Sequence, residues 1–552
     1  MPHAIPLHAL KYITTALKDW QSHSESLAEA VSSFANRPCV NLASCRVIHP
    51  YTKLLEEGGT PAMNRHDHAN GKSPANRIDL SEKRLRKADY QFLFPFSLKS
   101  DCRFALLNTL KLEGFTPFRL DKLDMEEAFY GQGHRVSHKE LERYFLPYAN
   151  HILFPSDDSA ESFRRMSKRL EAGGTLRMRS FEIPFKLHSV DVILCPFDTS
   201  FLTLRIHADK EALAFTEAVE FAARFRTLQD VQGADRATDI LYDGEKYSEI
   251  QDFIFKGIVP HMVQYLDRTA MDDTYFEQLP YFTDERMYVM ASYAFPEELD
   301  ISVIDRYRAA RLDGCNDGGN PDISACHLPY IKQYCRDTGL DRWAPHVFYQ
   351  MDENSFCCLN RLSGDEANAV VGKLYGEYYY ALLLNLFHRI VLLKLSDAYS
   401  RVQMERDSDK TERLIRDITR FSAKYNFPEI VSPVSGCEVF ARLHKLYRIE
   451  QLYGNVRQTL NDLYEYQKST TSRRSSYLLT ILTIYTVISG IYGMNQVIDD
   501  LEHPILWSRM DEYSPFQWIA LAVALSGLVV AFLLSGNVLW KWGRELLKRS
   551  RN

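Results

Sequence analysis

The side chains best suited to bind an anion lie between residues 161 and 179. They form a basic cluster: Arg164, Arg165, Lys168 and Arg169, followed by Arg177 and Arg179. The string SAESFRRMSKRLEAGG predicts a helix, and Ser156-Asp157-Asp158 would supply its N-cap. On a helix, the two adjacent arginines would lie one turn from Lys168 and Arg169, where guanidinium groups could bind a phosphate.

A helix face exposed to water explains the same cluster, because Glu161 and Glu171 could pair with its basic residues. Asp230, which ends the string RTLQD, is a weaker candidate for a polar partner of an anionic ligand. The sequence contains no nucleotide-hydrolysis motif, no Gly-x-Ser-x-Gly elbow and no His-Glu-x-x-His helix. We therefore do not expect the protein to be an enzyme.

A second pattern lies near the C-terminus and ends at the tetrad Tyr492-Gly493-Met494-Asn495. At a spacing near 3.5, a helix would carry one stripe made mostly of small, hydroxyl and glycine residues: Ser472, Ser476, Leu479, Thr483, Thr486, Gly490 and Gly493. Two interpretations stay open. The stripe could pack helices closely through small residues, or it could present a hydrated face that lines a pore.

Two apolar segments flank the tetrad, and each is expected to cross a lipid bilayer as a helix. Residues 475–491 are uncharged and just long enough to span the hydrocarbon core, whereas residues 516–540 are longer and carry Trp518 and Trp540 near their ends. Basic residues precede the first segment and follow the second. The positive-inside rule therefore predicts a multi-pass protein with both termini in the cytoplasm.

The portion before these segments is expected to be an α+β cytosolic domain. YQFLFPF, RSFEIPFKL, DVILCPF and SFLTLRIH predict strands, and KEALAFTEAVEFAARFRTL predicts a helix. Residues 363–427 are expected to be helical, with a buried helix at 381–395 because charged side chains interrupt its apolar run. From near Gly436, one helix is expected to continue to Asn495, a length of about 90 Å.

These observations give a domain order, which is as follows: an N-terminal extension with a loop-rich segment (1–85), the α+β cytosolic domain (86–345), a helical cytosolic segment (346–430), a stalk helix (431–474), a first transmembrane helix with the GMN motif (475–494), an external loop (495–515), a second transmembrane helix (516–540) and a basic cytosolic tail (541–552). The net charge of −6 gives no sign of nucleic-acid binding.

The string from Gly490 to Asn495, placed after a long helix and between two terminal apolar segments, resembles the CorA-like magnesium transporters. The resemblance implies a homopentamer with Gly493, Met494 and Asn495 as its selectivity filter. Thr483 and Thr486 would line the pore below, with Gly490 and a gate ring at Leu479. Mg²⁺ would be the transported or regulatory ion, and neutral oxygens would bind it hydrated because it loses its water shell reluctantly.

The chain carries more sequence ahead of the stalk than family members of ordinary size, which implies an added regulatory portion. In this it is similar to enlarged CorA-like proteins found with type III CRISPR systems. Two functions stay open: conduction of Mg²⁺ or other divalent cations across a prokaryotic inner membrane, or an antiviral effector opened by a nucleotide messenger such as a conjugate of S-adenosylmethionine with AMP. A third, a scaffold that does not conduct, is disfavoured by the intact tetrad.

Overall fold

The computed structural model covers most of the chain between residues 78 and 499. The residues that it describes are 78, 80–155, 161–228, 238–267, 286–316, 318–402, 408–427 and 429–499, with isolated positions between 515 and 529. The loop-rich N-terminal extension expected over residues 1–85 therefore lies almost entirely outside the described residues, and so does the expected basic tail.

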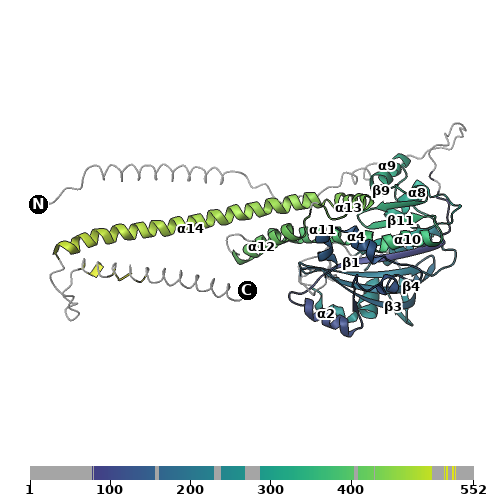
Figure 1. Ribbon diagram of the computed structural model, residues 1–552, viewed down its shortest axis with the longest axis horizontal. Coiled ribbons are helices and arrows are strands. Elements are labelled where there is room, and N and C mark those ends of the chain that lie inside the picture. The colour runs from purple at the N-terminus through teal and green to yellow at the C-terminus, as the bar shows by residue number, and fades with distance from the viewer. Residues whose placement is uncertain are drawn as a thin grey trace, which may run out of the picture. The chain divides into compact units, whose positions relative to one another are not determined.

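One mixed sheet of 11 strands forms the centre of the described part (Figure 1). Its strands, in chain order, are β1 (Lys87–Ser97), β2 (Thr116–Pro117), β3 (Arg164–Arg177), β4 (Glu182–Leu194), β5 (Thr199–Ala208), β6 (Asp239–Tyr242), β7 (Glu245–Tyr247), β8 (Tyr288–Ala294), β9 (Gly339–Leu340), β10 (Val347–Met351) and β11 (Ser355–Asn360). Across the sheet the order is β7-β6-β3-β4-β5-β1-β8-β11-β10-β9, and β2 pairs with β3 outside this path. The pairs are antiparallel except that of β11 with β8.

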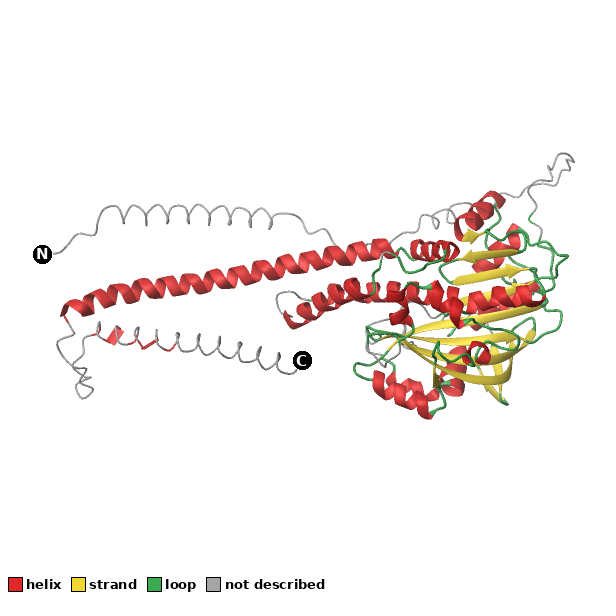
Figure 2. Ribbon diagram, viewed as in Figure 1, coloured by secondary structure: helices red, strands yellow, loops and turns green. Residues whose placement is uncertain are grey.

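Helices lie on both sides of this sheet (Figure 2). The shorter ones are α2 (Arg103–Leu112), α3 (Met125–Ala128), α4 (His138–Tyr144), α5 (Pro147–Leu153), α6 (Phe215–Phe225), α7 (Ile250–Asp252), the π-helix η2 (Phe253–Ile258), the 3₁₀-helix η3 (Pro260–Tyr265), α8 (Val303–Arg311) and α9 (Leu328–Thr338). They are followed by α10 (Gly364–Tyr375), α11 (Glu377–Arg401), α12 (Ser408–Lys424), α13 (Val434–Leu446) and α14 (Ile449–Asp499).

The two faces of the sheet differ in chemistry. Alternate residues of a strand point to opposite faces, so each central strand contributes to both. One face is apolar, with residues such as Phe92, Val192 and Leu204 packed against α2, α6, η2 and α8. The other face, which packs against α4, α5, α10 and α11, is apolar over one half and polar over the other. The polar half contains the candidate site described below.

Most strand predictions in this region are confirmed, with one correction. YQFLFPF lies in β1 and SFLTLRIH in β5, and the helix expected after Asp209 is α6. RSFEIPFKL and DVILCPF were expected as two strands but form the single strand β4. The reason is a β-bulge at His188, where the register of β4 with β5 shifts between Leu187 and Ser189, so the chain continues where a turn was expected.

The helices expected over residues 363–427 are present as α10, α11 and α12, and residues 381–395 are the buried middle of α11. The helical segment expected from residue 346 is wrong at its start, because residues 347–360 form the strands β10 and β11 and pair in the sheet. The expectation of one unbroken helix from Gly436 is wrong. The chain turns between α13 and α14, where Arg448 adopts a left-handed backbone with φ of 53°. Helix α14 contains 51 residues, which corresponds to about 77 Å.

The expectation of a membrane protein with two C-terminal transmembrane helices is overturned by the described residues. None of the helices described here is long and apolar enough to cross a membrane. Within α14, the run of residues 475–491 directly follows Arg473 and Arg474, and threonine, serine and glycine interrupt its apolar side chains. The expected location in an inner membrane depended on these spans, so it is corrected with them. Residues 516–540 lie almost entirely outside the described residues.

The close approach of α13 to α4 gives a test of this packing. A Cβ atom added to Gly436 would lie 2.5 Å from the Tyr144 ring and 2.6 Å from a methyl group of Val431. We expect Gly436→Ala to lower the free energy of unfolding by about 1–3 kcal/mol, because the core must shift to accept the methyl group. Thermal unfolding of the full chain measures this change.

Gly454→Ala is the matched control, because Gly454 lies inside α14 and a Cβ there meets no atom within 4 Å. Alanine favours a helix by about 1 kcal/mol over glycine, so this variant should unfold at the same or a higher temperature. Equal destabilisation by the two substitutions would contradict the packing of α13 on α4.

Candidate functional site

The predicted basic helix is wrong, because residues 164–177 form strand β3. Pairing with β4 along most of its length overrides the helical propensity of Arg, Lys, Leu and Glu in this segment. On a strand, Arg164 and Arg165 point to opposite faces, so they cannot bind one phosphate as a pair. Lys168 lies with its Nζ 5.7 Å from the centre of the Phe115 ring, and Arg169 is paired with Glu171 at the surface.

Arg165 points to the polar half of the sheet, where it joins a buried charged group. Its Nε lies 3.0 Å from Oδ2 of Asp191 on β4, and Nη1 of Arg205 on β5 lies 2.6 Å from the same oxygen. Arg205 also donates through Nε to Oε1 of Gln91 on β1, at 3.1 Å. These four residues, Asp191, Arg165, Arg205 and Gln91, are called the Asp191 network below. They connect four neighbouring strands.

The Asp191 network is almost completely removed from solvent. Arg165 is 4% exposed, and the other three residues are 0% exposed. Burial alone would lower the pKa of the Arg165 guanidinium, but the negative charge of Asp191 outweighs this and raises it well above its ordinary value. Arg165 therefore stays charged, and the network holds two guanidinium groups against one carboxylate.

Aromatic rings surround the two guanidinium groups. The central carbon of Arg165 lies 4.2 Å from the centre of the Phe118 ring, and that of Arg205 lies 5.1 Å from Tyr130 and 5.4 Å from Tyr379. The negative faces of these rings offset part of the unbalanced positive charge. Cation–π contact does not satisfy hydrogen-bond donors, however, and donors of this network remain without acceptors.

Residues 129–136, called the cover segment below, lie over the Asp191 network. The Tyr130 hydroxyl accepts a hydrogen bond from Nη1 of Arg165 at 3.2 Å, and the carbonyl of Phe129 accepts one from Ser189 at 2.6 Å. Gly131 has φ of +92°, and a Cβ there would lie 2.7 Å from Nε2 of His188. Only glycine allows the cover segment to approach the sheet this closely.

A second polar group, centred on Asp89, lies next to the network along β1 and β5 and reaches the surface at Lys87 and His207. The Asp89 carboxylate lies 2.9 Å from Nδ1 of His207, 3.4 Å from Nε2 of His134 and 3.5 Å from Nζ of Lys87. Burial would raise the pKa of Asp89, but hydrogen bonds from the two histidines and the charge of Lys87 lower it strongly. Among the described residues, no group of His, Cys, Asp or Glu side chains has a geometry that could hold a metal ion.

The network is also bonded to α11. Arg165 donates through Nη1 to the Tyr380 hydroxyl at 3.0 Å, and the hydroxyls of Thr203 and Tyr379 lie 2.8 Å apart. Burial, opposed by the charge of Arg165, raises the pKa of Tyr380 to about 12, so its hydroxyl stays protonated. Helix α11 packs against α12, α13 and α14. A change at the network can therefore reach the helix that carries the tetrad.

The residues expected to line a pore lie along α14. Leu479, Thr483, Thr486 and Gly490 are exposed in the single chain, and the two threonine hydroxyls donate to carbonyls of the preceding turn. Gly493, Met494 and Asn495 belong to the same helix, but their side chains lie outside what the structure describes. Both interpretations of the stripe, close packing and a hydrated face, therefore stay open.

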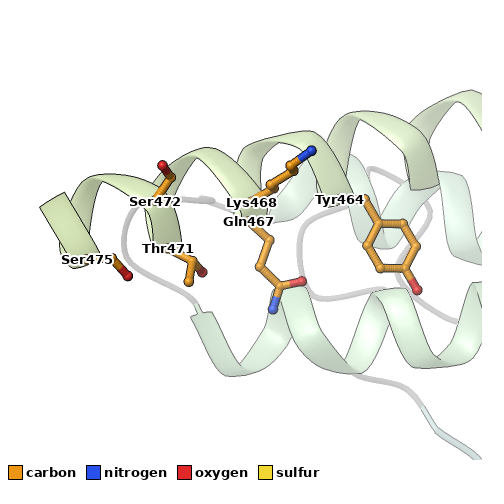
Figure 3. Close-up of a pocket in the computed structure, with 6 residues that line it drawn as sticks. All are labelled: Tyr464, Gln467, Lys468, Thr471, Ser472 and Ser475. Atoms are coloured by element: carbon orange, nitrogen blue, oxygen red, sulfur yellow. The ribbon is translucent and has the colours of Figure 1, made fainter.

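A shallow pocket of about 450 Å³ lies on α14 just before the apolar run (Figure 3). Its lining residues are polar apart from one ring: Tyr464, Gln467, Lys468, Thr471, Ser472 and Ser475. The pocket lies far along the chain from the Asp191 network. Lys468 is the one charged residue among those that line it. We therefore place the candidate ligand site at the network.

Sequence reasoning found Arg165 but missed Asp191, Arg205, Gln91 and Asp89. Their signal was a polar residue at every second position in strands that are otherwise apolar, as in ADYQF and TLRIH. Such residues are buried on a sheet face only if they have partners there. Asp230 lies outside the described residues, so its expected role stays a prediction.

No protein-family model matches the chain, and no curated protein matches it.

The lowered pKa of Asp89 predicts how stability depends on pH. A carboxyl with a lowered pKa in the folded state stabilises the fold above its unfolded pKa, near 3.9, and this contribution is lost as the pH falls below that value. We expect Asp89→Asn to lower the unfolding temperature at neutral pH. The difference between variant and wild type should shrink as the pH falls below about 4.

Asp121→Asn is the control, because Asp121 pairs with Arg119 but both side chains are largely exposed. Exposed ion pairs contribute little to stability, so this variant should unfold like the wild type at each pH. If Asp89→Asn unfolded at the same temperature as the wild type at neutral pH, the structural role assigned to the Asp89 group would be wrong.

Proposed function

We propose that the protein is a ligand-regulated Mg²⁺-handling protein. In this proposal the α+β domain is the sensor, and α14 carries the response to the segment from Tyr492 to Asn495. The observation that supports it best is the polar connection from the Asp191 network through Tyr379 and Tyr380 to α11, which packs against α14.

The composition of the Asp191 network favours a sensor over a purely structural core. A buried ion pair is rarely more stable than apolar residues of the same volume, so a buried group with unbalanced charge is weak support for a role in stability. Charged groups held in such surroundings are more often found at functional sites. The network also bonds the sheet to α11, which packs against α14, as a relay requires.

The Mg²⁺ part of the proposal rests on the sequence around the tetrad. Gly493, Met494 and Asn495 offer backbone carbonyls and an amide, which are neutral oxygen ligands suited to a hydrated ion. The homopentamer implied by the resemblance belongs to the proposal, since a ring of Asn495 amides needs several copies of the chain. The mass of the purified protein in solution would check it.

An antiviral effector controlled by a nucleotide messenger is the second candidate function. The surplus of positive charge at Arg165 and Arg205 favours it, because a phosphate-bearing messenger would supply the missing negative charge. The two candidates differ in what regulates the protein. A Mg²⁺-handling protein would respond to the Mg²⁺ concentration of the cell, whereas an antiviral effector would respond only to the nucleotide messenger.

Asn495→Ala tests the Mg²⁺ assignment. We expect Mg²⁺ binding by the purified variant to weaken about tenfold or more, because the amide that binds the hydrated ion is lost. Titration calorimetry with MgCl₂ measures the affinity. Asn455→Ala, at an exposed asparagine of the same helix, should leave the affinity unchanged. Wild-type affinity of the Asn495 variant for Mg²⁺ would remove the assignment.

Tyr380→Phe tests the relay, because it deletes the hydroxyl that joins Arg165 to α11 without touching α14. We expect the affinity of the purified protein for Mg²⁺ to change severalfold while the amount of folded protein stays close to that of the wild type. Tyr330→Phe, at a tyrosine that is 52% exposed on α9, is the matched control. Equal affinities of all three proteins for Mg²⁺ would contradict the sensor role of the network.

A further inference from the structure

Three hydrogen-bond donors of the Asp191 network have no acceptor among the described residues. They are Nη2 of Arg165, Nη2 of Arg205 and Nε2 of Gln91. All three residues are more than nine-tenths buried, and each unpaired buried donor costs about 1–3 kcal/mol. Native structures rarely leave such groups unpaired, so the shared deficit of three neighbouring residues needs an explanation.

Most of the deficit lies with donors. Both carboxylate oxygens of Asp191 also lack a hydrogen bond, but Oδ2 forms ion pairs with Arg165 and Arg205, and the amide oxygen of Gln91 already accepts from Arg205. The two guanidinium groups together carry one positive charge more than Asp191 balances. A group with several acceptor oxygens and a negative charge would satisfy both needs at once, whereas a neutral ligand would satisfy only the first.

The cover segment lies over Arg165, and an anion bound there would have to displace it. The Tyr130 hydroxyl is the cover segment's one hydrogen bond to Arg165 among the contacts described, and its oxygen is a neutral acceptor. An anionic oxygen in the same position would make a stronger, charge-assisted bond to the guanidinium. Gly131 and Gly133, with φ of +92° and +79°, give the segment backbone freedom to move aside.

We propose that Arg165, Arg205 and Gln91 form a buried binding site for an oxyanion, either a phosphate or a carboxylate group, beneath the cover segment. The anion displaces the Tyr130 hydroxyl from Arg165 and accepts hydrogen bonds from the three unpaired donors. Access is from the Asp89 group, where Lys87 and His207 are partly exposed. The inference rests on the proposed function only in treating this anion as the ligand of the sensor.

Titration calorimetry of the full chain with inorganic phosphate tests the site, with sodium acetate in a parallel titration at equal ionic strength. We expect saturable phosphate binding by the wild type. Gln91→Leu should weaken it about three- to tenfold, which corresponds to one lost hydrogen bond. Arg205→Gln should weaken it further. Saturation by acetate, with no binding of phosphate, would assign the site to carboxylates.

Gln350→Leu is the matched control, because Gln350 is a fully buried glutamine of the same sheet, on β10. It should bind phosphate as the wild type does. Circular dichroism identifies variants that fail to fold. If Arg205→Gln does not fold, Gln91→Leu still tests the site, because it changes no charge. If neither phosphate nor acetate bound saturably to the wild type, the proposed site would be wrong. Ordered water molecules would then be the acceptors of its unpaired donors.

The two proposals fail in different ways. Phosphate binding that is lost in Gln91→Leu, together with normal Mg²⁺ affinity of Tyr380→Phe, would keep the anion site and remove its role as a sensor. Unchanged phosphate affinity in folded Gln91→Leu and Arg205→Gln would overturn the site even if Tyr380→Phe altered the affinity for Mg²⁺.

Discussion

The carboxylate of Asp191 is the contact on which the polar half of the sheet depends. It pairs with two buried arginines from the strands on either side of it, and those arginines in turn bond to β1, to the cover segment and to α11. Removal of one partner from such a group leaves an uncompensated buried charge, which is strongly destabilising. The hydrogen bond from the sheet to α11 through Tyr380 therefore depends on the pairing of Arg165 with Asp191.

Much of the sheet could be predicted from the sequence, because β1, β4 and β5 are dense in Phe, Val, Ile and Leu and their borders carry turn residues. Strand β3 could not, since Arg164 to Leu170 have helical propensity and only pairing with β4 makes them a strand. The break at Arg448 was also missed, because no glycine or proline marks it. The expected span at residues 475–491 shows the opposite error, in which an apolar run just long enough to cross a bilayer was taken for a transmembrane helix.

The candidate site was found in part for the wrong reason. Arg165 was selected as one of a helical cluster, whereas its role in the structure depends on Asp191, Arg205 and Gln91, which come from other strands. Strand pairing brings these residues together, and a single sequence contains no direct record of which strands pair. The alternation of polar and apolar residues in ADYQF and TLRIH shows that one face of each strand carries polar side chains. It does not show which side chains meet.

The place of β1 in the sheet has a consequence for how the chain folds during synthesis. This strand is made first among the long ones, yet it lies between β5 and β8, which follow much later in the chain. Until both have left the ribosome, its apolar side chains and unpaired backbone groups have no native partners, and such a segment is prone to aggregate. Pairing of residues so distant in sequence also slows folding. The nascent chain would therefore be expected to need a chaperone until β8 has emerged.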